Sequence, residues 1–475
     1  MISTGIEPLI GHMRNGARPV LTAAEWRSTL KAWAHLLFFL LLNSFLYNHH
    51  FKIGINLYFS DLLVFALLAL TLFIWMEASP GRDTQPWLWF FFLLFAYYLF
   101  LAFYAYAWLG NGIPDIMGRF RHLYFYLLPF LAGLVFTHSG KDGTKYFWFI
   151  RIHVLVSVVI GVLSLKYPGL SMSRIYLEGE LADPRYFMVV THGTALLCCL
   201  LFVHELVTLA TRRRGGVRPV FFLVVALVGI LGSQNRSVLI TFLLMAGLVF
   251  LFGFNAGKET RKRMRVCAVL TVALFAGFSL ALMLSPLYAK FQDRITETID
   301  AFSGKQEFFT TIPGIRVGRT IATYREWLKS PVIGCGWGSQ ITEFQIYDLE
   351  GNYIRTNYGT PHNYYITILY QAGVIGFMIM MAFLGGVFWR IRPAGKMDSE
   401  NVAGYSLFIF YAGFLVFNIA NTLFYGNPVF IPVCGYLLGA AVSLAGTPSG
   451  RGKDLRPIRP WPSEPAVISP GAAGA

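Results

Sequence analysis

The chain has few charged residues for its length. Only 13% of its 475 residues are Asp, Glu, Lys or Arg, whereas 56% are hydrophobic. A soluble protein of this size could not bury so much apolar side chain, because its surface needs polar groups. The composition therefore excludes an ordinary soluble protein and indicates a chain that crosses a membrane many times.

Groups that form disulfides or hold metal ions are also scarce. Of the five cysteines only Cys335 lies outside the apolar runs, and no zinc-like spacing is present, so we expect no disulfide framework. The sequence contains no Asp-x-Asp and predicts no sizeable cytoplasmic domain, which argues against a nucleotide-sugar donor held through a metal ion. We expect neither a metal site nor a cofactor.

Long apolar runs dominate what is present. A membrane-spanning helix takes about 20 mostly apolar residues, and we count about 12 such runs. They lie near residues 33 to 47, 57 to 76, 87 to 109, 120 to 137, 146 to 165, 185 to 209, 218 to 233, 237 to 254, 266 to 285, 364 to 388, 403 to 425 and 429 to 445. We predict an all-α polytopic membrane protein whose transmembrane helices fill residues 32–285 and 364–445.

The placement of basic residues predicts the topology. If the N-terminus is cytoplasmic, most Lys and Arg of the connecting segments fall on the cytoplasmic side. Residues 1–31 would then be a cytoplasmic N-terminal segment, and residues 446–475, rich in Pro, Gly and Arg, a disordered cytoplasmic tail. Lys and Arg on the inner face, near anionic membrane lipid, account for most of the net charge of +15. We therefore expect no nucleic-acid partner.

Residues 286–363 form the one long hydrophilic segment, and this topology places them outside. Loops of such length are usually functional. One helix is predicted over Thr320 to Lys329. Pro331 ends it, and the turn Gly334-Cys-Gly336-Trp-Gly338 follows. Before it, an amphipathic helix on the membrane surface is predicted by apolar residues at helical spacing, namely Phe291, Ile295, Ile299 and Phe302.

His362 stands where this loop enters the next apolar run. Thr360 is predicted as the N-cap and Pro361 as the first helical residue, which puts His362 in the first turn. The helix dipole disfavours a charged imidazolium there, and a neutral imidazole can accept a proton. His362 is therefore a candidate general base. The alternative is a histidine that only caps a helix near the lipid headgroups.

Arginines cluster at the predicted outer face. Arg236 lies in a very short polar break between two apolar runs, and Arg185 begins another run. Arg316 and Arg319 precede the predicted loop helix. An arginine near lipid normally has a partner, and its planar, bidentate donors suit a diphosphate. The alternative is that they pair with nearby acids such as Asp183 or with headgroup phosphates.

The spacing around the histidine has a counterpart in a known family. His362 and Asn363 are followed, after nine residues, by Gly373 and then by Gly376. Upstream, Arg319 precedes a segment with Trp327, Pro331 and Gly334-Cys-Gly336. This pattern resembles the O-antigen ligase and O-antigen polymerase superfamily of bacterial membrane glycosyltransferases.

The resemblance implies transfer of a glycan from undecaprenyl diphosphate to an acceptor hydroxyl, without a metal, at the periplasmic face of the bacterial cell inner membrane. His362 would be the catalytic base. Arg236, Arg185 and Arg319 would bind the donor diphosphate, with Asn363 and Arg316 in support. Direct displacement by the acceptor would invert the anomeric centre.

The acceptor stays open at this stage. The histidine pattern favours a ligase that uses lipid A core, while a polymerase would use a growing O-antigen or exopolysaccharide chain. A flippase for the same lipid is the rival from another class. A transporter is expected to carry polar groups at the membrane midplane and internal repeats. Here the polar groups collect at the outer face, which favours the enzyme.

Overall fold

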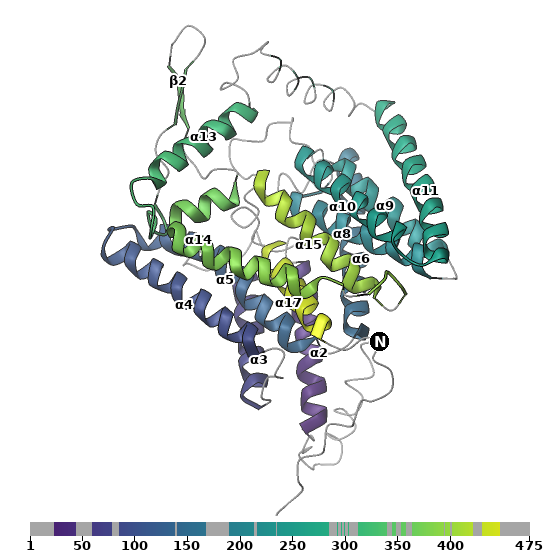
Figure 1. Cartoon of the computed structure of the whole chain (residues 1–475), viewed down its shortest axis with the longest axis horizontal. Helices are drawn as coiled ribbons and strands as arrows, with labels where there is room; N and C mark the ends of the chain where they lie inside the picture. The colour runs from purple at the N-terminus through teal and green to yellow at the C-terminus, as the bar shows by residue number, and fades with distance from the viewer. Residues whose placement is uncertain are drawn as a thin grey trace, which may run out of the picture.

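Helices make up nearly all of the described chain (Figure 1). The computed structural model describes residues 23–43, 59–77, 85–137, 140–167, 190–212, 216–233, 235–284, 312–339, 344–347, 353–357, 363–393, 395–399, 401–420 and 430–446, with isolated positions between 292 and 303. The helices are α2 (Ala23–Leu42), α3 (Phe59–Glu77), α4 (Gln85–Ala107), α5 (Ile113–Phe136), α6 (Gly140–Lys166), α8 (His192–Thr211), α9 (Val217–Gly232), α10 (Arg236–Phe254), α11 (Lys258–Met283), α13 (Ile312–Trp327), α14 (Tyr364–Ile391), α15 (Val402–Ala420) and α17 (Phe430–Gly446).

Each predicted apolar run overlaps one of these helices. Among the described residues, seven helices are long and apolar enough to cross a membrane, and four shorter apolar helices accompany them. The length and composition of these helices confirm the prediction of a helical membrane protein. The count of about 12 spans stays a prediction.

The described chain also contains a short hairpin, which the all-α prediction did not include. Strands β1 (Phe344–Tyr347) and β2 (Tyr353–Asn357) pair antiparallel, with Phe344 opposite Asn357. Both lie within the segment 286–363. The amphipathic helix predicted over residues 291 to 302 falls mostly outside the described residues.

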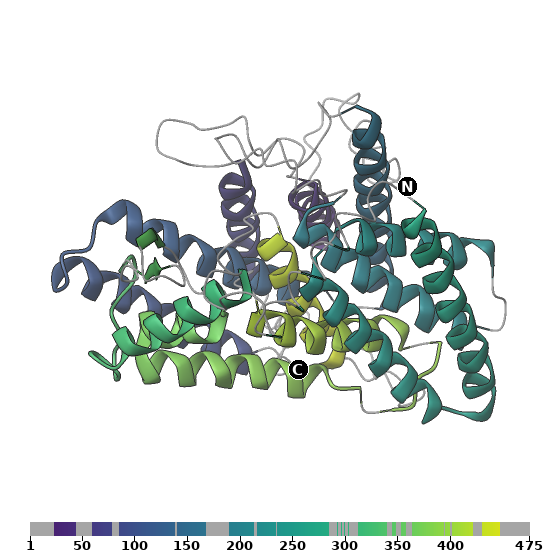
Figure 2. The same ribbon diagram turned by 90° about the horizontal axis from the view of Figure 1, so that it is seen from above.

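The centre of the bundle is a close pair of helices, α5 and α17. In Figures 1 and 2 they lie between α3 and α4 on one side and α11 on the other. Glycine makes the approach possible: a Cβ on Gly439 would collide with the carbonyl of Phe130, and one on Gly435 with the carbonyl of Tyr126. Small residues at four-residue spacing commonly let membrane helices touch backbone to backbone.

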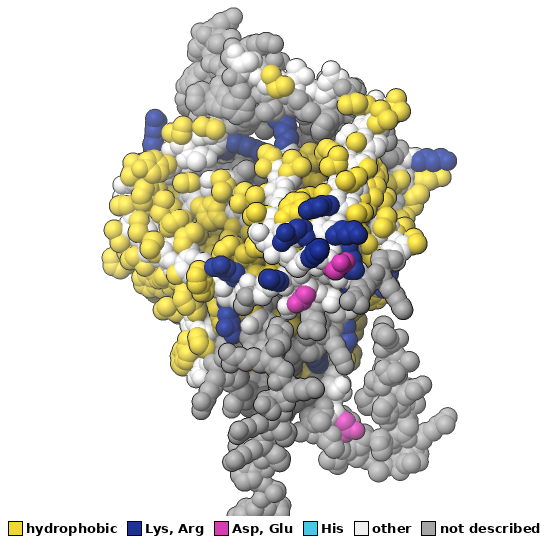
Figure 3. Space-filling model, turned by 45° about the vertical axis from the view of Figure 1, so that its right-hand side comes forward, with side chains coloured by type: hydrophobic (Ala, Val, Ile, Leu, Met, Phe, Trp, Pro, Cys, Tyr) yellow, Lys and Arg dark blue, Asp and Glu magenta, His cyan; other side chains and the backbone are white. Residues whose placement is uncertain are grey.

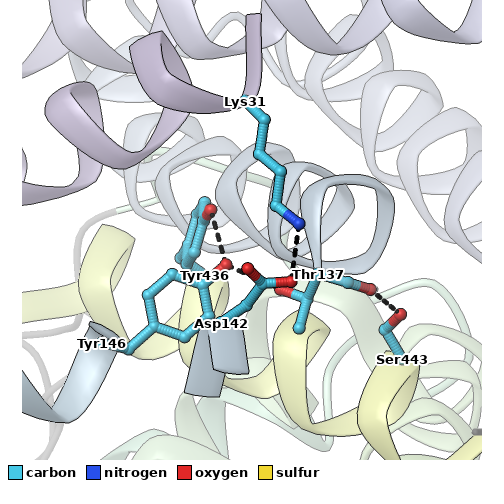
Figure 4. Close-up of polar contacts among 6 residues, drawn as sticks. All are labelled: Lys31, Thr137, Asp142, Tyr146, Tyr436 and Ser443. Atoms are coloured by element: carbon cyan, nitrogen blue, oxygen red, sulfur yellow. Dashed lines mark hydrogen bonds and ion pairs between the residues drawn. The ribbon is translucent and has the colours of Figure 1, made fainter. Parts of the chain in front are cut away.

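Polar side chains join the ends of four helices around this pair (Figure 4). Lys31 on α2 forms an ion pair with Asp142 on α6, with 2.7 Å between Nζ and Oδ2. The hydroxyl of Tyr146 lies 2.9 Å from that of Thr137 and 3.2 Å from that of Tyr436 on α17. The network ties α2 and α6 to the α5–α17 pair.

Two further ion pairs are buried between helices. Arg151 on α6 meets Glu205 on α8 at 2.6 Å, and Arg121 on α5 meets Asp61 on α3 at 3.1 Å. Removing one partner of such a pair costs about 3 to 5 kcal/mol, because the other charge stays buried. Loss of either arginine alone is therefore expected to destabilise the bundle.

Candidate functional site

The candidate site begins where α14 starts, at Asn363. Its side chain is the N-cap of the helix, since Oδ1 accepts from the backbone N–H of Ile366 at 3.1 Å. The prediction that Thr360 is the N-cap was therefore wrong, and His362 precedes the helix instead of lying in its first turn. Asn serves as well as Thr in this role. Helix α14 therefore begins at Tyr364, three residues after the predicted start at Pro361.

Ten residues further on, α14 is broken at Gly373. This glycine has φ 63° and ψ −171°, a conformation outside the helical region and strained for any residue with a Cβ. A break leaves the backbone groups on either side without their partners inside the helix. The helix consequently needs donors and acceptors from another part of the chain.

The segment 331–336 supplies those partners by docking onto residues 370–375 of α14. We call these two segments together the latch. Two amides of the segment 331–336 donate to carbonyls of α14 before the break. Two carbonyls of the same segment accept from amides of α14 after the break. The bonds run from Cys335 N to Tyr370 O (2.8 Å), Gly336 N to Gln371 O (3.1 Å), Val374 N to Pro331 O (2.9 Å) and Ile375 N to Val332 O (3.3 Å). Backbone groups thus satisfy most of the break.

Glycine is required on both sides of the latch. A Cβ on Gly373 would collide with the carbonyl of Val332, and one on Gly334 would lie 2.5 Å from the amide nitrogen of Gly373. Gly334 also has a positive φ, of 86°. The two backbones are therefore in direct contact, which only glycine permits.

The next two glycines carry the segment onto α4 and α5. Gly336 and Gly338 have φ 77° and 79°, and a Cβ on Gly338 would lie 2.8 Å from the amide nitrogen of Ile116. Between them Trp337 is buried, and its carbonyl accepts from Asn111 Nδ2 at 2.8 Å. The turn predicted here is a docking element with its own partners.

The latch fixes α13 relative to α14. The helix predicted over Thr320 to Lys329 is present as α13, but it starts at Ile312 and ends at Trp327. Helix α13 contacts α14 and ends beside its bend (Figure 1). Arg316 and Arg319, both half-buried, lie on the preceding turns of α13.

Arg236 is the first residue of α10. The side chain of Asn235 caps this helix by accepting from the amide of Ser237 at 2.9 Å. A positive side chain at the positive end of a helix dipole is electrostatically unfavourable unless an anion joins it. The half-buried Arg236 therefore stands at a position suited to a negative ligand.

Helix α15 shows where Arg236 lies, because α10 packs against it antiparallel. Phe252 near the end of α10 contacts Tyr405 near the start of α15, at a ring distance of 5.9 Å. Further along, Met245 lies against Gly413. Continuing this register puts Arg236 at the C-terminal end of α15.

The start of α14 reaches the same end of α15. The hydroxyl of Tyr365, two residues after Asn363, donates to the carbonyl of Leu415 at 2.7 Å. The fold thus brings Asn363 and Arg236 to one end of the bundle, although they are far apart in sequence. His362 and Arg185 lie outside the described residues, so their predicted meeting with Arg236 stays a prediction.

Cys335 sits in the latch without being a candidate nucleophile. Burial raises the pKa of its thiol, and Glu326 nearby acts in the same direction. A raised pKa keeps the thiol protonated at neutral pH, and the thiolate is the reactive form. In the described part of the chain, no group of three or more His, Cys, Asp or Glu lies together as a metal ion would need.

Comparison with known proteins bears on this geometry. Residues 221–381 match the family model described as O-antigen ligase. The resemblance to the O-antigen ligase and polymerase superfamily is thereby confirmed. The match includes Arg236, the α13 arginines, the latch and the His362-Asn363 pair, while Arg185 lies before it. No curated protein matches the chain.

Sequence reasoning missed the latch. It identified the turn at Gly334 and the pair Gly373 and Gly376 separately, without joining them. It also missed Tyr97 on α4, whose hydroxyl donates to the carbonyl of Ala372 at 3.1 Å, just before the break. The one available signal was a glycine in the middle of an apolar run, which is unfavourable in a helix unless the backbone needs it.

We predict that Gly373→Ala destabilises the protein by at least about 1 to 3 kcal/mol, the range for a non-glycine residue held in strained backbone. The matched control is Gly385→Ala in the same helix, where a Cβ meets nothing within 4 Å. Alanine there should be neutral or slightly stabilising. Thermal unfolding of the two purified variants checks this, and equal unfolding midpoints would contradict the role of Gly373.

Proposed function

We propose that this protein transfers a glycan from undecaprenyl diphosphate to an acceptor hydroxyl at the periplasmic face of the bacterial inner membrane. One observation carries the proposal. The segment that matches the O-antigen ligase model contains the latch, which connects the arginine-bearing α13 to the helix that begins directly after His362-Asn363.

In the proposed reaction His362 takes the proton from the acceptor hydroxyl. The acceptor oxygen then attacks the anomeric carbon, and the bond from that carbon to the diphosphate oxygen breaks. Undecaprenyl diphosphate leaves with the bonding electron pair, so the anomeric centre is inverted. A positioned base contributes roughly 10² to 10⁴ to the rate. No covalent intermediate, metal ion or cofactor enters this scheme.

Arginines would stabilise the charge on the leaving diphosphate. Arg236 has the best support, because the dipole of α10 and the guanidinium both attract an anion at the same place. Arg319 and Arg316 would contribute from α13, and Arg185 from the start of its run. Charge-assisted hydrogen bonds are worth roughly 1.5 to 3 kcal/mol each, so two or three of them supply a substantial part of the acceleration.

The acceptor we favour is lipid A core, because the spacing from His362 to Gly376 follows the ligase pattern. A polymerase that extends an O-antigen or exopolysaccharide chain is the alternative within the family. The proposed orientation has both termini in the cytoplasm and residues 286–363 in the periplasm. This orientation follows from the distribution of Lys and Arg.

Replacing Arg236 by lysine separates charge from geometry. Lysine keeps the positive charge but lacks the planar pair of donors, so we expect Arg236→Lys to lower turnover about tenfold or more. Arg325→Lys, at an exposed position on α13, is the control and should retain wild-type turnover. Glycan transfer by the purified variants provides the measurement. Near-normal turnover in Arg236→Lys would rule out bidentate diphosphate binding by this residue.

Removing the imidazole tests the base. We expect His362→Ala to lower turnover by roughly 10² to 10⁴ while binding of the lipid-linked donor stays nearly unchanged. Wild-type activity should also fall at low pH, as the imidazole becomes protonated and can no longer accept a proton.

A histidine that only supports the start of α14 predicts a different outcome. The alanine variant would then be less stable but would turn over at close to the normal rate once folded. Donor binding, turnover and unfolding are therefore measured on one preparation. A folded His362→Ala protein that keeps more than about a tenth of wild-type turnover would remove His362 from the catalytic residues.

A further inference from the structure

A dense group of basic side chains lies at one end of helices α8, α9 and α11, and we call it the basic corner. It comes from the C-terminal end of α8 and from the N-terminal ends of α9 and α11. Its members are Arg212, Arg218, Lys258, Arg261, Lys262 and Arg263. Figure 3 shows Lys and Arg side chains gathered on one face of the molecule, with hydrophobic side chains around them.

The ends of α8 and α11 in the basic corner are joined to each other. Arg263 near the start of α11 donates from Nη1 to the carbonyl of Thr211, the last residue of α8, at 3.5 Å. Arg261 donates to the carbonyl of Ala256 at 3.4 Å, which closes the turn before α11. Basic groups at the C-terminus of α8 also suit the negative end of its dipole.

Glu259 lies among the residues of the basic corner on α11, and Glu205 interacts electrostatically with Arg212 and Arg218, but two acids do not balance six basic groups. Within the described residues, none of the corner's six members forms an ion pair with an Asp or Glu. Five of the six are exposed, and Arg263 is half-buried. So many like charges in one place repel one another, which an anion at the corner would relieve.

The surface next to the corner is apolar and exposed. Val217 is 87% exposed and Val266 66% exposed, each within a few residues of the basic side chains. Trp148 on α6 is 47% exposed, and the guanidinium of Arg218 lies 5.2 Å from its ring centre. Tryptophan and arginine at such a boundary are typical of the level of the lipid headgroups. A ligand with a phosphate beside acyl chains fits this arrangement better than a soluble anion does.

Helix α11 gives this site a structural role. It lies at the edge of the bundle, and only 11% of its apolar stretch is buried by other parts of the protein. It contacts α8, α9 and α10. A ligand that bridges the helix ends at its base would add to these few contacts.

We propose that the basic corner is a binding site for an anionic phospholipid, and that the bound lipid secures α11 to α8 and α9. Basic pockets between membrane helices at the cytoplasmic face bind lipids such as cardiolipin through their phosphates. The topology predicted from the sequence puts the corner at that face. The site is separate from the glycan-transfer site and does not depend on it.

The test compares two charge-matched double variants of the full chain. Arg261→Gln with Lys262→Gln removes two charges from the corner, whereas Lys166→Gln with Lys329→Gln removes two exposed charges elsewhere. Lys166 lies at the opposite end of α6 from Trp148 and also has a ring beside it, that of Tyr167 at 5.8 Å. Delipidated protein is titrated with cardiolipin, with phosphatidylcholine and with inorganic diphosphate. Thermal unfolding and native mass spectrometry report binding.

Cardiolipin should raise the unfolding midpoint of the wild type and of the control variant, and phosphatidylcholine should not. A basic residue near an anionic surface contributes roughly fivefold to affinity, so the corner variant should bind cardiolipin about thirtyfold more weakly. Equal weakening in both variants would mean that only the total surface charge matters, and the proposal would be wrong. It would also be wrong if diphosphate stabilised the wild type as well as cardiolipin does and the corner variant lost that effect, or if the lipids did not differ.

Discussion

The break in α14 is the constraint on which the rest of the site depends. Backbone amides and carbonyls inside a membrane protein must find partners, since water is not there to replace them. At Gly373 the helix cannot supply them, and four hydrogen bonds from the segment 331–336 do so instead. Where such a group is buried, leaving it unsatisfied costs roughly 1 to 3 kcal/mol, so these bonds hold the loop against the helix. Glycine on both sides is what allows the two backbones to meet.

This arrangement holds the described residues around 331–338 in place against α14. Helix α13 ends just before the latch, α14 begins six residues before Tyr370, and Trp337 anchors the same segment between α4 and α5. Acid-base catalysis and diphosphate binding both need side chains held to within a fraction of an ångström. A scaffold built from backbone contacts provides that fixity without adding polar side chains inside the bundle. Helix α13, which carries Arg316 and Arg319, and helix α14, which begins directly after Asn363, therefore share one junction.

The sequence predicted the helices well because their signal is local. An apolar run about 20 residues long is enough to identify a membrane helix, and each predicted run coincides with one. Features that depend on distant partners were not predictable in this way. The ion pair of Arg121 with Asp61 joins two helices that are far apart in sequence, and no local pattern indicates it. The latch likewise joins residues about forty positions apart, and neither half signals the other. The cap at Asn363 was missed because Thr360 is equally suitable by residue type, and only tertiary packing decides between them.

The central claim is that this chain itself joins a lipid-diphosphate-linked glycan to an acceptor without a metal ion. The most direct measurement supplies purified protein in detergent with undecaprenyl diphosphate-linked glycan and lipid A core, in excess EDTA, and follows the glycosylated acceptor and the released undecaprenyl diphosphate by mass spectrometry. The account predicts both products in equal amounts, with the anomeric configuration inverted. Binding of the donor with no product would indicate a transporter of the same lipid, and product that appears only when Mg²⁺ or Mn²⁺ is restored would contradict the proposed mechanism.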